Sequence, residues 1–377
     1  MFKQGLNVQA AVRRIGVLRR GIVTDARAMV YSSYGEPGDK LRAISYQLPD
    51  PKDDQVVLRL LAAPINPSDV NQVQGVYPAR PPFTNELDPE TPSAVGGNEG
   101  VFEVVEVGKN VTSCKVGDWT LPAVGNFGTW RSHVLTEAKS VNALPNRNIT
   151  PIQAATVSVN PATAHQMLRE FADMRPGDFF IQNGANSGVG RAAIQLGRLW
   201  GFRSINVVRN RPDIDALKSE LTGLGADYIV TEEEIGSKSF RPTIKEWTKD
   251  SQVKLALNGI GGKSCTSITR QLSPGGHLVT YGAMSKQPIS LPTGLFIFSD
   301  IHAHGYWLSG WAKKNPDAKF KVVTELLDLM SAGKVKDTPV TPHTWSQSQS
   351  LEEFGQSFLT AMDANMNGKG KQLMLFK

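Results

Sequence analysis

Between residues 179 and 307, short apolar runs alternate with longer segments whose apolar positions recur at helical spacing. The first run, Phe179–Gln182, precedes a glycine-rich loop, and the segment after that loop carries Ala192, Leu196 and Leu199 in a helical pattern. Further strands are predicted at Ser204–Val208, Tyr228–Val230, Val253–Asn258, His277–Tyr281 and within the apolar stretch Leu295–Trp307. Helices are predicted between them, over about 213–223, near 241–249 and near 263–272.

Strands that alternate with helices of this length form right-handed crossovers, which place the strands in one parallel sheet with helices on both faces. Six strands in this arrangement are typical of the doubly wound fold that binds dinucleotides. The last stretch, Leu295–Trp307, is predicted as an edge strand, and an exposed edge favours pairing with a second copy of the chain. The pattern therefore predicts an α/β protein with a nucleotide-binding half.

The loop after the first predicted strand, Asn183–Gly190, has glycines at positions 184, 188 and 190. Residues without a Cβ let the backbone turn sharply and come close to a pyrophosphate. The helix that follows would offer unpaired N–H donors and the positive end of its dipole. The loop therefore predicts a phosphate-binding turn.

The glycine spacing departs from GxGxxG and is also similar to that of the short-chain reductases. Those enzymes rely on a Tyr-x-x-x-Lys pair, but here Tyr281 is followed by Ser285 at the required position and Lys286 stands one place late. A long segment also precedes the loop. Both observations argue against the short-chain class.

The end of the second predicted strand indicates which cofactor binds. An NAD site places an acidic residue there to accept a hydrogen bond from the ribose 2′-hydroxyl. This strand instead continues with Arg209, Asn210 and Arg211, and the first acid is Asp213. Two guanidinium groups can hold a 2′-phosphate through charge-assisted hydrogen bonds, so the segment predicts NADPH. The alternative is a solvated basic turn.

The net charge of +6 does not indicate nucleic acid binding. Residues 1–24 contain five basic residues and no acid, which leaves 36 basic against 35 acidic residues in the rest of the chain. A nearly neutral body lacks the electrostatic footprint for a phosphate backbone. No apolar stretch is long enough to span a bilayer. The two cysteines, Cys114 and Cys265, lack a CxxC spacing, which excludes a disulfide framework and a thiolate zinc cluster.

Residues 1–24 are interpreted as a mitochondrial transit peptide. The segment is rich in arginine and free of acids, and Val12, Ile15, Leu18 and Ile22 fall on one helical stripe. Paired arginines interrupt every apolar run that could serve as the core of a secretory signal. Import into the mitochondrial matrix is therefore predicted, with cleavage around residues 18–26. The alternative is a basic tail without a targeting role.

Several motifs resemble the medium-chain dehydrogenase/reductase superfamily in their order along the chain, namely Pro64–Asp69, Gly96–Gly100, Gly117–Trp119 and Asn183–Gly190. In finer detail the chain resembles the mitochondrial trans-2-enoyl-CoA or enoyl-acyl-carrier-protein reductases from about residue 28 to its end. The segments that carry this finer resemblance are Leu61–Asn71, Ala94–Gly100, Gly128–Trp130, Ser158–Ala164, Asn206–Asp213, Gly261–Ser264 and Tyr281–Pro288.

The resemblance implies a GroES-like catalytic domain joined to a doubly wound Rossmann domain that binds NADPH. The catalytic domain would span residues 25–157, with residues 307–377 returning to it, and the Rossmann domain residues 158–306. It also implies a homodimer formed through the region of Leu295–Trp307.

The comparison with the zinc enzymes of the superfamily predicts that no metal is bound. Where those alcohol dehydrogenases place their zinc ligands, this chain has Asn66, Asn98 and Asn160. A neutral amide is a poor ligand for zinc, which prefers thiolate, imidazole or carboxylate groups. Alcohol oxidation assisted by a metal is therefore excluded, and the chemistry suits a substrate already activated for hydride addition.

For an enoyl thioester, hydride would add to the β-carbon and a proton would reach the α-carbon. Tyr77, within Gly75–Pro78, matches the tyrosine that the enoyl reductases use as the catalytic acid, and the resemblance implies the same role here. Alternatively, Tyr77 is an aromatic residue that only stacks on the substrate. Many quinone reductases carry a similar tyrosine, so this residue alone does not decide the substrate.

The resemblance also implies a set of cofactor contacts, several of which follow directly after predicted strands. These contacts are Asn160, Asn186, Ser187, Gly188, Val189, Arg209, Asn210, Arg211, Tyr281, Gly282, Ala283, Met284, Tyr306, Trp307, Leu308 and Lys371. Asn160 could also act as an ordinary N-cap, because Pro161 follows it.

Two other functions remain open on the sequence alone. A zinc-free quinone oxidoreductase would share the fold, NADPH and a tyrosine at position 77. A non-catalytic module that binds NADPH within a regulatory complex would share the fold and the cofactor only. Turnover of an enoyl thioester, and its loss on replacement of Tyr77, would distinguish the reductase from both.

Overall fold

The computed structural model describes residues 25–145, 148–237, 240–249 and 251–377, and the predicted transit peptide at residues 1–24 lies outside them. Within these residues, one lobe is built on a six-stranded sheet of order β11-β10-β9-β12-β13-β14. All neighbouring strands in it are parallel. The order runs outwards in both directions from β9, which confirms the predicted doubly wound sheet. Its strands are β9 (Phe179–Asn183), β10 (Arg203–Val208), β11 (Tyr228–Thr231), β12 (Val253–Asn258), β13 (His277–Thr280) and β14 (His302–Gly305).

Helices cover both faces of this sheet because successive strand residues point to opposite sides. On β9, Phe180 packs into one apolar cluster with residues of α4 and α5. Its neighbours Phe179 and Ile181 pack into another cluster with residues of α7, α8 and α9. The helices of this lobe are α4 (Asn160–Glu170), α5 (Gly188–Leu199), α6 (Ile214–Leu224), α7 (Glu232–Gly236), α8 (Phe240–Thr248), α9 (Gly262–Thr269) and α10 (Thr293–Ser299).

The stretch Leu295–Trp307 is not one strand, and in this respect the prediction is wrong. Helix α10 occupies Thr293–Ser299, and Asp300 ends it in the left-handed conformation with φ 48°. Only His302–Gly305 forms a strand, β14, at the edge of the sheet. A short apolar run has the same composition in a helix as in a strand, so the sequence pattern could not distinguish the two.

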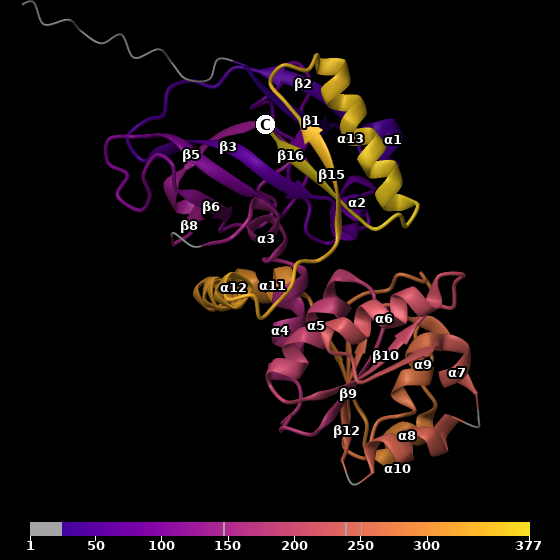
Figure 1. The fold of residues 1–377 in the computed structure, drawn as a ribbon. Coiled ribbons are helices and arrows are strands. Elements are labelled where there is room, and N and C mark those ends of the chain that lie inside the picture. The colour runs from indigo at the N-terminus through magenta and orange to yellow at the C-terminus, as the bar shows by residue number, and fades with distance from the viewer. Residues whose placement is uncertain (1–24, 146–147, 238–239, 250) are drawn as a thin grey trace, which may run out of the picture.

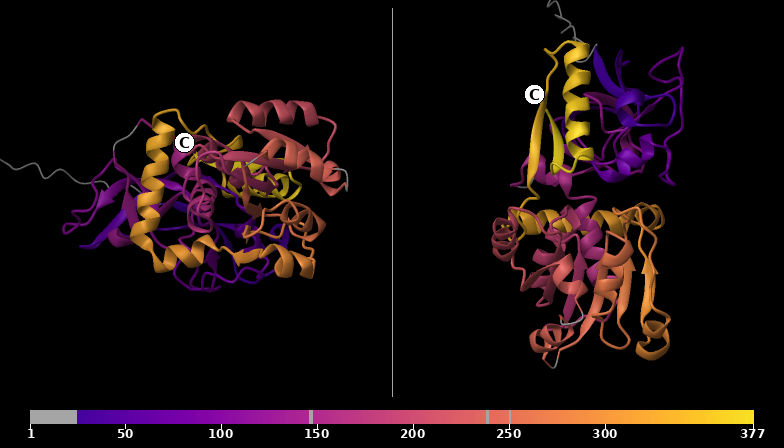
Figure 2. Two further views of the ribbon diagram at one scale, coloured as in Figure 1. Left: turned by 90° about the horizontal axis from the view of Figure 1, so that it is seen from below. Right: turned by 90° about the vertical axis from the view of Figure 1, so that its right-hand side faces the viewer.

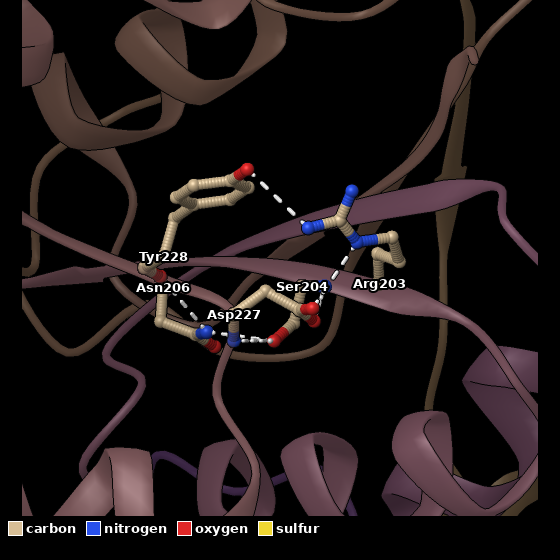
Figure 3. Close-up of polar contacts among 5 residues, drawn as sticks. All are labelled: Arg203, Ser204, Asn206, Asp227 and Tyr228. Carbon is tan, nitrogen blue, oxygen red and sulfur yellow. Dashed lines mark hydrogen bonds and ion pairs between the residues drawn. The ribbon is translucent and has the colours of Figure 1, made fainter. Parts of the chain in front are cut away.

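Polar side chains join β10 to β11 near the start of each strand (Figure 3). The carboxylate of Asp227 accepts hydrogen bonds from the Ser204 amide at 2.8 Å and from Arg203 Nε at 3.1 Å. The side-chain amide of Asn206 donates through Nδ2 to Ser204 Oγ at 2.8 Å and to the carbonyl of Tyr228 at 3.1 Å. These contacts satisfy buried polar groups and hold the two strands in register.

The second lobe contains the remaining strands of the described residues (Figure 1). In the described part of the chain, β15-β16-β3-β5-β6-β8 form a seven-stranded sheet together with β7, which pairs with β3. β2-β1-β4 form a smaller, three-stranded sheet. The strands are β1 (Ala26–Tyr31), β2 (Arg42–Tyr46), β3 (Gln55–Pro64), β4 (Ala94–Val95), β5 (Val101–Val107), β6 (Trp119–Pro122), β7 (His133–Glu137), β8 (Val141–Ala143), β15 (Val340–Trp345) and β16 (Lys371–Phe376).

The C-terminal segment returns to this second lobe. Strand β16 runs antiparallel to β3, and α13 packs beside them, as the yellow ribbon next to the indigo one shows (Figure 1). Trp345 stacks on Phe354 of α13 with ring centroids 4.0 Å apart, and Phe358 joins the same buried cluster. The remaining helices are α1 (Pro37–Lys40), α2 (Pro67–Val73), the 3-10 turn η1 (Ala138–Ser140), α3 (Pro151–Thr156), α11 (Leu308–Lys314), α12 (Pro316–Ser331) and α13 (Leu351–Met366).

The two lobes lie end to end with α11 and α12 between them (Figures 1 and 2). One buried apolar cluster joins Val101 of β5, Ala193 of α5 and Leu326 of α12, so side chains of both lobes share a core at the junction. Among the described residues, no helix is both long enough and apolar enough to cross a membrane.

A buried histidine makes the stability of the fold depend on pH. Burial, helped by the charge of Arg59, lowers the pKa of His133 from 6.5 to about 4. Between these values the unfolded chain binds a proton that the folded chain excludes. His133 therefore contributes stability that is present above pH 6.5 and is lost as the pH falls towards 4, a loss of about 3 kcal/mol.

We expect the replacement His133→Gln to flatten the dependence of the free energy of unfolding on pH over this range. Urea denaturation at stepped pH values would measure the slope for the wild type and for the variant. Equal slopes in the two proteins would contradict the assignment to His133.

Candidate functional site

The turn from β9 into α5 can be built only with glycine at key positions. Gly184 has φ 60°, in the left-handed region. A Cβ on Gly190 would lie 2.5 Å from the carbonyl oxygen of Ala185, a distance that backbone atoms do not allow. Ser187 caps the helix, and its Oγ accepts a hydrogen bond from the Gly190 amide at 3.1 Å. The result is a close approach of strand and helix, with the N-terminus of α5 at the carboxyl edge of the sheet.

Asn160 lies against this turn. A Cβ on Gly188 would be 2.7 Å from Asn160 Nδ2, so the asparagine occupies the space that a side chain at position 188 would need. Asn160 is the first residue of α4, and Val159 holds the N-cap position. The interpretation of Asn160 as a helix cap is therefore wrong, and its amide is directed at the loop instead.

Tyr281–Met284, which follow β13, lie beside the same turn. Burial raises the pKa of Tyr281 to about 12, against the opposing effect of a hydrogen bond with Ser187. The Met284 amide donates to the carbonyl of Gly259 at 3.1 Å, and a Cβ on Gly259 would lie 2.7 Å from the Tyr281 hydroxyl oxygen. The segment is thus fixed at the carboxyl edge, where cofactors bind in sheets of this type.

Arg209, Asn210 and Arg211 follow β10 at the same edge. Arg209 and Asn210 are exposed, whereas Arg211 is half-buried. Arg211 Nε is shielded from solvent and has no hydrogen-bond partner among the described residues. A buried cationic donor without an acceptor is costly, and an anion such as a 2′-phosphate would satisfy it. The turn, the adjacent strand ends and this donor together fit an NADPH molecule.

Tyr77 of the second lobe contacts Trp307, which lies between β14 of the parallel sheet and α11. Trp307 Nε1 donates to the hydroxyl oxygen of Tyr77 at 2.8 Å, across 230 positions of sequence. Their rings meet edge to face, with centroids 6.1 Å apart. The Tyr306 amide, one residue earlier, donates to the carbonyl of Thr280 at 2.9 Å and ties this segment to the end of β13. Leu308 follows as the first residue of α11.

The side chain of Tyr306 lies against the C-terminal end of α4. It packs edge to face on Phe171, with ring centroids 5.8 Å apart, and its hydroxyl is buried without a partner among the described residues. Burial, with a smaller effect of the Glu170 carboxylate, raises the pKa of Tyr306 well above its usual value. Tyr306 and Phe171 line a cavity of about 300 Å³, and Trp307 and Trp311 also contribute to its apolar wall.

Lys371, one of the predicted cofactor contacts, lies in a polar network at the lobe junction. Its Nζ donates to Asn66 Oδ1 at 2.5 Å, and Asn66 Nδ2 donates to Glu99 Oε2 at 2.9 Å. Burial lowers the pKa of Lys371, against the opposing charges of Glu99 and Asp69. The Lys371 side chain therefore contacts Asn66, at a position where the zinc enzymes have a metal ligand. The sequence could not predict this contact.

The network contains a second ammonium group and a second carboxylate. Burial lowers the pKa of Lys319 to about 8, although the Glu99 carboxylate opposes the shift, and the Lys319 ammonium donates to the carbonyl of Ser158. Burial raises the pKa of Asp69 to about 6, although a hydrogen bond from Asn98 opposes this. Paired charges and amides therefore fill the region where the zinc enzymes hold their metal.

Sequence reasoning missed Asp69, Gln72, Glu99 and Lys319. For Asp69 and Gln72 the sequence offers one signal, their spacing of three residues, which places them on one face of a helix. The structure adds that both side chains are almost fully buried. Two polar residues on the buried face of one helix indicate a polar network. Glu99 and Lys319 give no local signal, since their partners are distant in sequence.

Comparison with known proteins places the chain among dehydrogenases and reductases. A family described as alcohol dehydrogenase GroES-like domain matches residues 52–146, and one described as zinc-binding dehydrogenase matches residues 188–331. A mitochondrial enoyl-acyl-carrier-protein reductase from Yarrowia lipolytica is 48% identical over 349 residues, which are 93% of this chain and 91% of the relative.

Two solved structures are similar over the same extent. The complex of Etr1p with NADP and crotonyl-CoA is 39% identical with a TM-score of 0.90, and the match covers 94% of this chain and 100% of that one. The mitochondrial 2-enoyl thioester reductase Etr1p/Etr2p heterodimer from Candida tropicalis is 40% identical with a TM-score of 0.90. This match also covers 94% of this chain and 100% of that one.

The described residues do not fit the zinc that the second family description names. Asn66 and Asn98 present amides, both already bonded to carboxylates. Nowhere in residues 25–145, 148–237, 240–249 and 251–377 do three His, Cys, Asp or Glu side chains gather in a way that could hold a metal ion.

Proposed function

Because the chain belongs to the mitochondrial enoyl-acyl-carrier-protein reductase family, we propose that it uses NADPH to reduce trans-2-enoyl thioesters to acyl thioesters in mitochondrial fatty acid synthesis. The thioester is carried by coenzyme A or by an acyl carrier protein. The observation that carries the proposal is the Tyr77 hydroxyl, which is hydrogen-bonded to Trp307 where the catalytic lobe meets the carboxyl edge of the nucleotide-binding sheet. The proposed site of action is the mitochondrial matrix.

The residues that would hold NADPH lie at four strand ends of the parallel sheet. Ser187, Gly188 and the amides at the start of α5 would bind the pyrophosphate, and Arg209 and Arg211 the 2′-phosphate. Tyr281–Met284 and Tyr306–Leu308 follow β13 and β14 and would flank the nicotinamide half. When bound, NADPH supplies a hydride to the β-carbon of the substrate. Lys371, which donates to Asn66, would complete the cofactor contacts from the C-terminal strand β16.

Tyr77 is the proposed proton donor to the α-carbon. An indole N–H can only donate, so Tyr77 must accept from Trp307, and the phenolic hydrogen is left available for the substrate. The chain therefore supplies both an acid and a group that orients it.

The domain division and the assembly belong to the same proposal. The catalytic domain spans residues 25–157 with residues 307–377, and the Rossmann domain residues 158–306. In support, β16 pairs with β3. A homodimer would form through β14, the edge strand of the parallel sheet, whose unpaired backbone groups can continue the sheet into a second copy. Residues 1–24 would direct import.

Steady-state assays with trans-2-hexenoyl-CoA test the proposed function. NADPH oxidation should be rapid with the thioester and slow with a simple quinone, and NADH should replace NADPH poorly. Turnover of the quinone alone would indicate a quinone oxidoreductase. NADPH binding without any turnover would indicate a non-catalytic module.

The packing of Trp307 makes a further prediction at Gly310. A Cβ at this position would lie 2.6 Å from Trp307 Cε3, so Gly310→Ala should push the indole away from Tyr77. We expect kcat with hexenoyl-CoA to fall about 10-fold, since small displacements of a catalytic group cost this much or more. The control is Gly223→Ala in α6, where an added Cβ meets nothing within 4 Å, and kcat should stay unchanged. Equal kcat in both variants would contradict the role of Trp307.

A further inference from the structure

A chain of side-chain amides connects the buried carboxylate of Asp69 to the loop that carries Tyr77. Asn98 Nδ2 donates to Asp69 Oδ1 at 2.7 Å and to Gln72 Oε1 at 2.6 Å. Gln72 Nε2 in turn donates to the carbonyl of Ala79 at 2.7 Å and to Asn126 Oδ1 at 2.8 Å. The backbone amide of Asn126 donates to Asn98 Oδ1 at 3.2 Å, so the three residues Asn98, Gln72 and Asn126 form a closed ring of hydrogen bonds.

The direction of every bond in this chain is fixed. The carbonyl of Ala79 can only accept, so Gln72 must turn its NH₂ group towards it. The Asn126 backbone amide can only donate, so Asn98 must present its oxygen there and its NH₂ group to Asp69. The ionised carboxylate of Asp69 can only accept, which is consistent with the NH₂ group of Asn98 facing it. Neither amide can flip without breaking a buried hydrogen bond, and such a break is costly.

The chain ends at the Tyr77 loop and restrains it from one side. Ala79 is two residues after Tyr77, and its carbonyl is held by Gln72. On the other side, the amides of Val76 and Tyr77 donate to the carbonyl of Asn71 at 3.0 and 3.2 Å. Val76 is 70% exposed, so its own side chain adds little packing to the loop.

The other end of the chain lies in the rigid part of the catalytic lobe. Asp69 is 1% exposed, and its Oδ2 also accepts from the Asn66 backbone amide at 2.8 Å at the start of α2. A buried carboxylate that is held by the helix start is a fixed reference point. Asn98 and Gln72 transmit its position to the exposed loop.

From this geometry we infer that Gln72 and Asn98 are positioning residues for Tyr77. They hold the loop so that the Tyr77 hydroxyl stays beside Trp307 and the carboxyl edge of the nucleotide-binding sheet. The inference rests on the proposed role of Tyr77 as proton donor. It assigns to Asn98, at a position where the zinc enzymes have a metal ligand, a mechanical role in a reaction that uses no metal.

The test is a double-mutant cycle between Gln72→Met and Tyr77→Phe with crotonyl-CoA as substrate. Methionine keeps the length of the side chain and removes the two hydrogen bonds that Gln72 donates and the one that it accepts from Asn98. We expect Gln72→Met to lower kcat by about 10-fold to 100-fold and to leave the Kd for NADPH, measured by cofactor fluorescence, within about twofold. In the Tyr77→Phe background the same change should lower kcat by less than about twofold, because residues that act as a unit are not additive.

The matched control is Gln74→Met in the same region of the chain. Gln74 is two residues further on, and its amide donates only to the exposed Glu36 carboxylate at 3.3 Å. Its kcat should equal that of the wild type. A second variant, Asn98→Ala, cuts the chain between Asp69 and Gln72 while leaving the contact with Ala79, and it tests the inference if Gln72→Met does not fold.

Two results would overturn the inference. One is a kcat for Gln72→Met equal to that of Gln74→Met. The other is an equal loss of kcat in the wild-type and Tyr77→Phe backgrounds, which indicates a structural effect independent of Tyr77. A Tyr77→Phe variant with wild-type kcat would instead overturn the proton-donor role, and the inference with it, and the single variant alone reveals this.

Discussion

Replacing Tyr77 with phenylalanine should lower kcat for trans-2-hexenoyl-CoA by about 100-fold to 10,000-fold, the range that positioned general acids contribute. The phenyl ring keeps the edge-to-face contact with Trp307, so the loss arises from the missing hydroxyl. The KM for NADPH should change little, because the residues that would bind its phosphates lie on the other lobe, at the start of α5 and after β10. Stopped-flow absorbance at 340 nm in single-turnover mode would report the chemical step directly.

The control for this variant is Tyr34→Phe. The Tyr34 ring packs against Gly75 in the same loop, since a Cβ on that glycine would lie 2.7 Å from the ring. Removing its hydroxyl should leave kcat unchanged. A Tyr77→Phe enzyme as active as Tyr34→Phe would show that the proton reaches the α-carbon by another route, and Tyr77 would then serve only as a packing residue.

The second large effect is expected at the end of β10. Replacing Arg209 and Arg211 together with alanine should lower kcat/KM for NADPH by about 100-fold to 10,000-fold, since each hydrogen bond to a charged group contributes about 1.5–3 kcal/mol. NADH has no 2′-phosphate, so its kcat/KM should change by less than about threefold. The ratio of the two cofactors' kcat/KM values is the quantity to measure.

An exposed arginine far from this edge serves as the control. Arg270 follows α9, whose C-terminus leads to the start of β13 and therefore to the opposite edge of the sheet. Arg270→Ala should leave the NADPH to NADH ratio as in the wild type. If the double variant lost kcat/KM equally with NADPH and with NADH, the loss would indicate damage to the fold rather than a lost phosphate contact.

The nucleotide-binding lobe was largely predictable because its signals are local. Each strand of a parallel sheet is buried on both faces, so β9, β10 and β12 appear in the sequence as compact apolar runs between helical segments. The exception is the stretch before β14. There Ile297 and Phe298 are apolar yet 66% and 84% exposed in α10, so their hydrophobicity reflects neither burial nor a strand.

The contacts of the proposed site were predictable only in part because they join distant positions. The sequence identified Tyr77 and Trp307 separately, through a resemblance, but their hydrogen bond depends on how the lobes are arranged. The same holds for Lys371, which reaches Asn66 across 305 positions. Periodicity and motif spacing carry no information about such pairs, so the polar network at the lobe junction emerges only from the fold.

Isotope labelling would show where the hydride of NADPH and the proton from solvent enter the product. Crotonyl-CoA would be reduced in ordinary water with NADPH deuterated at C4 on the transferred face, and the butyryl-CoA analysed by NMR. We expect deuterium at the β-carbon and a solvent-derived hydrogen at the α-carbon. With unlabelled NADPH in heavy water, deuterium should instead appear at the α-carbon. Deuterium at the α-carbon, or no butyryl-CoA at all, would contradict the claim that this chain reduces enoyl thioesters by hydride addition and separate protonation.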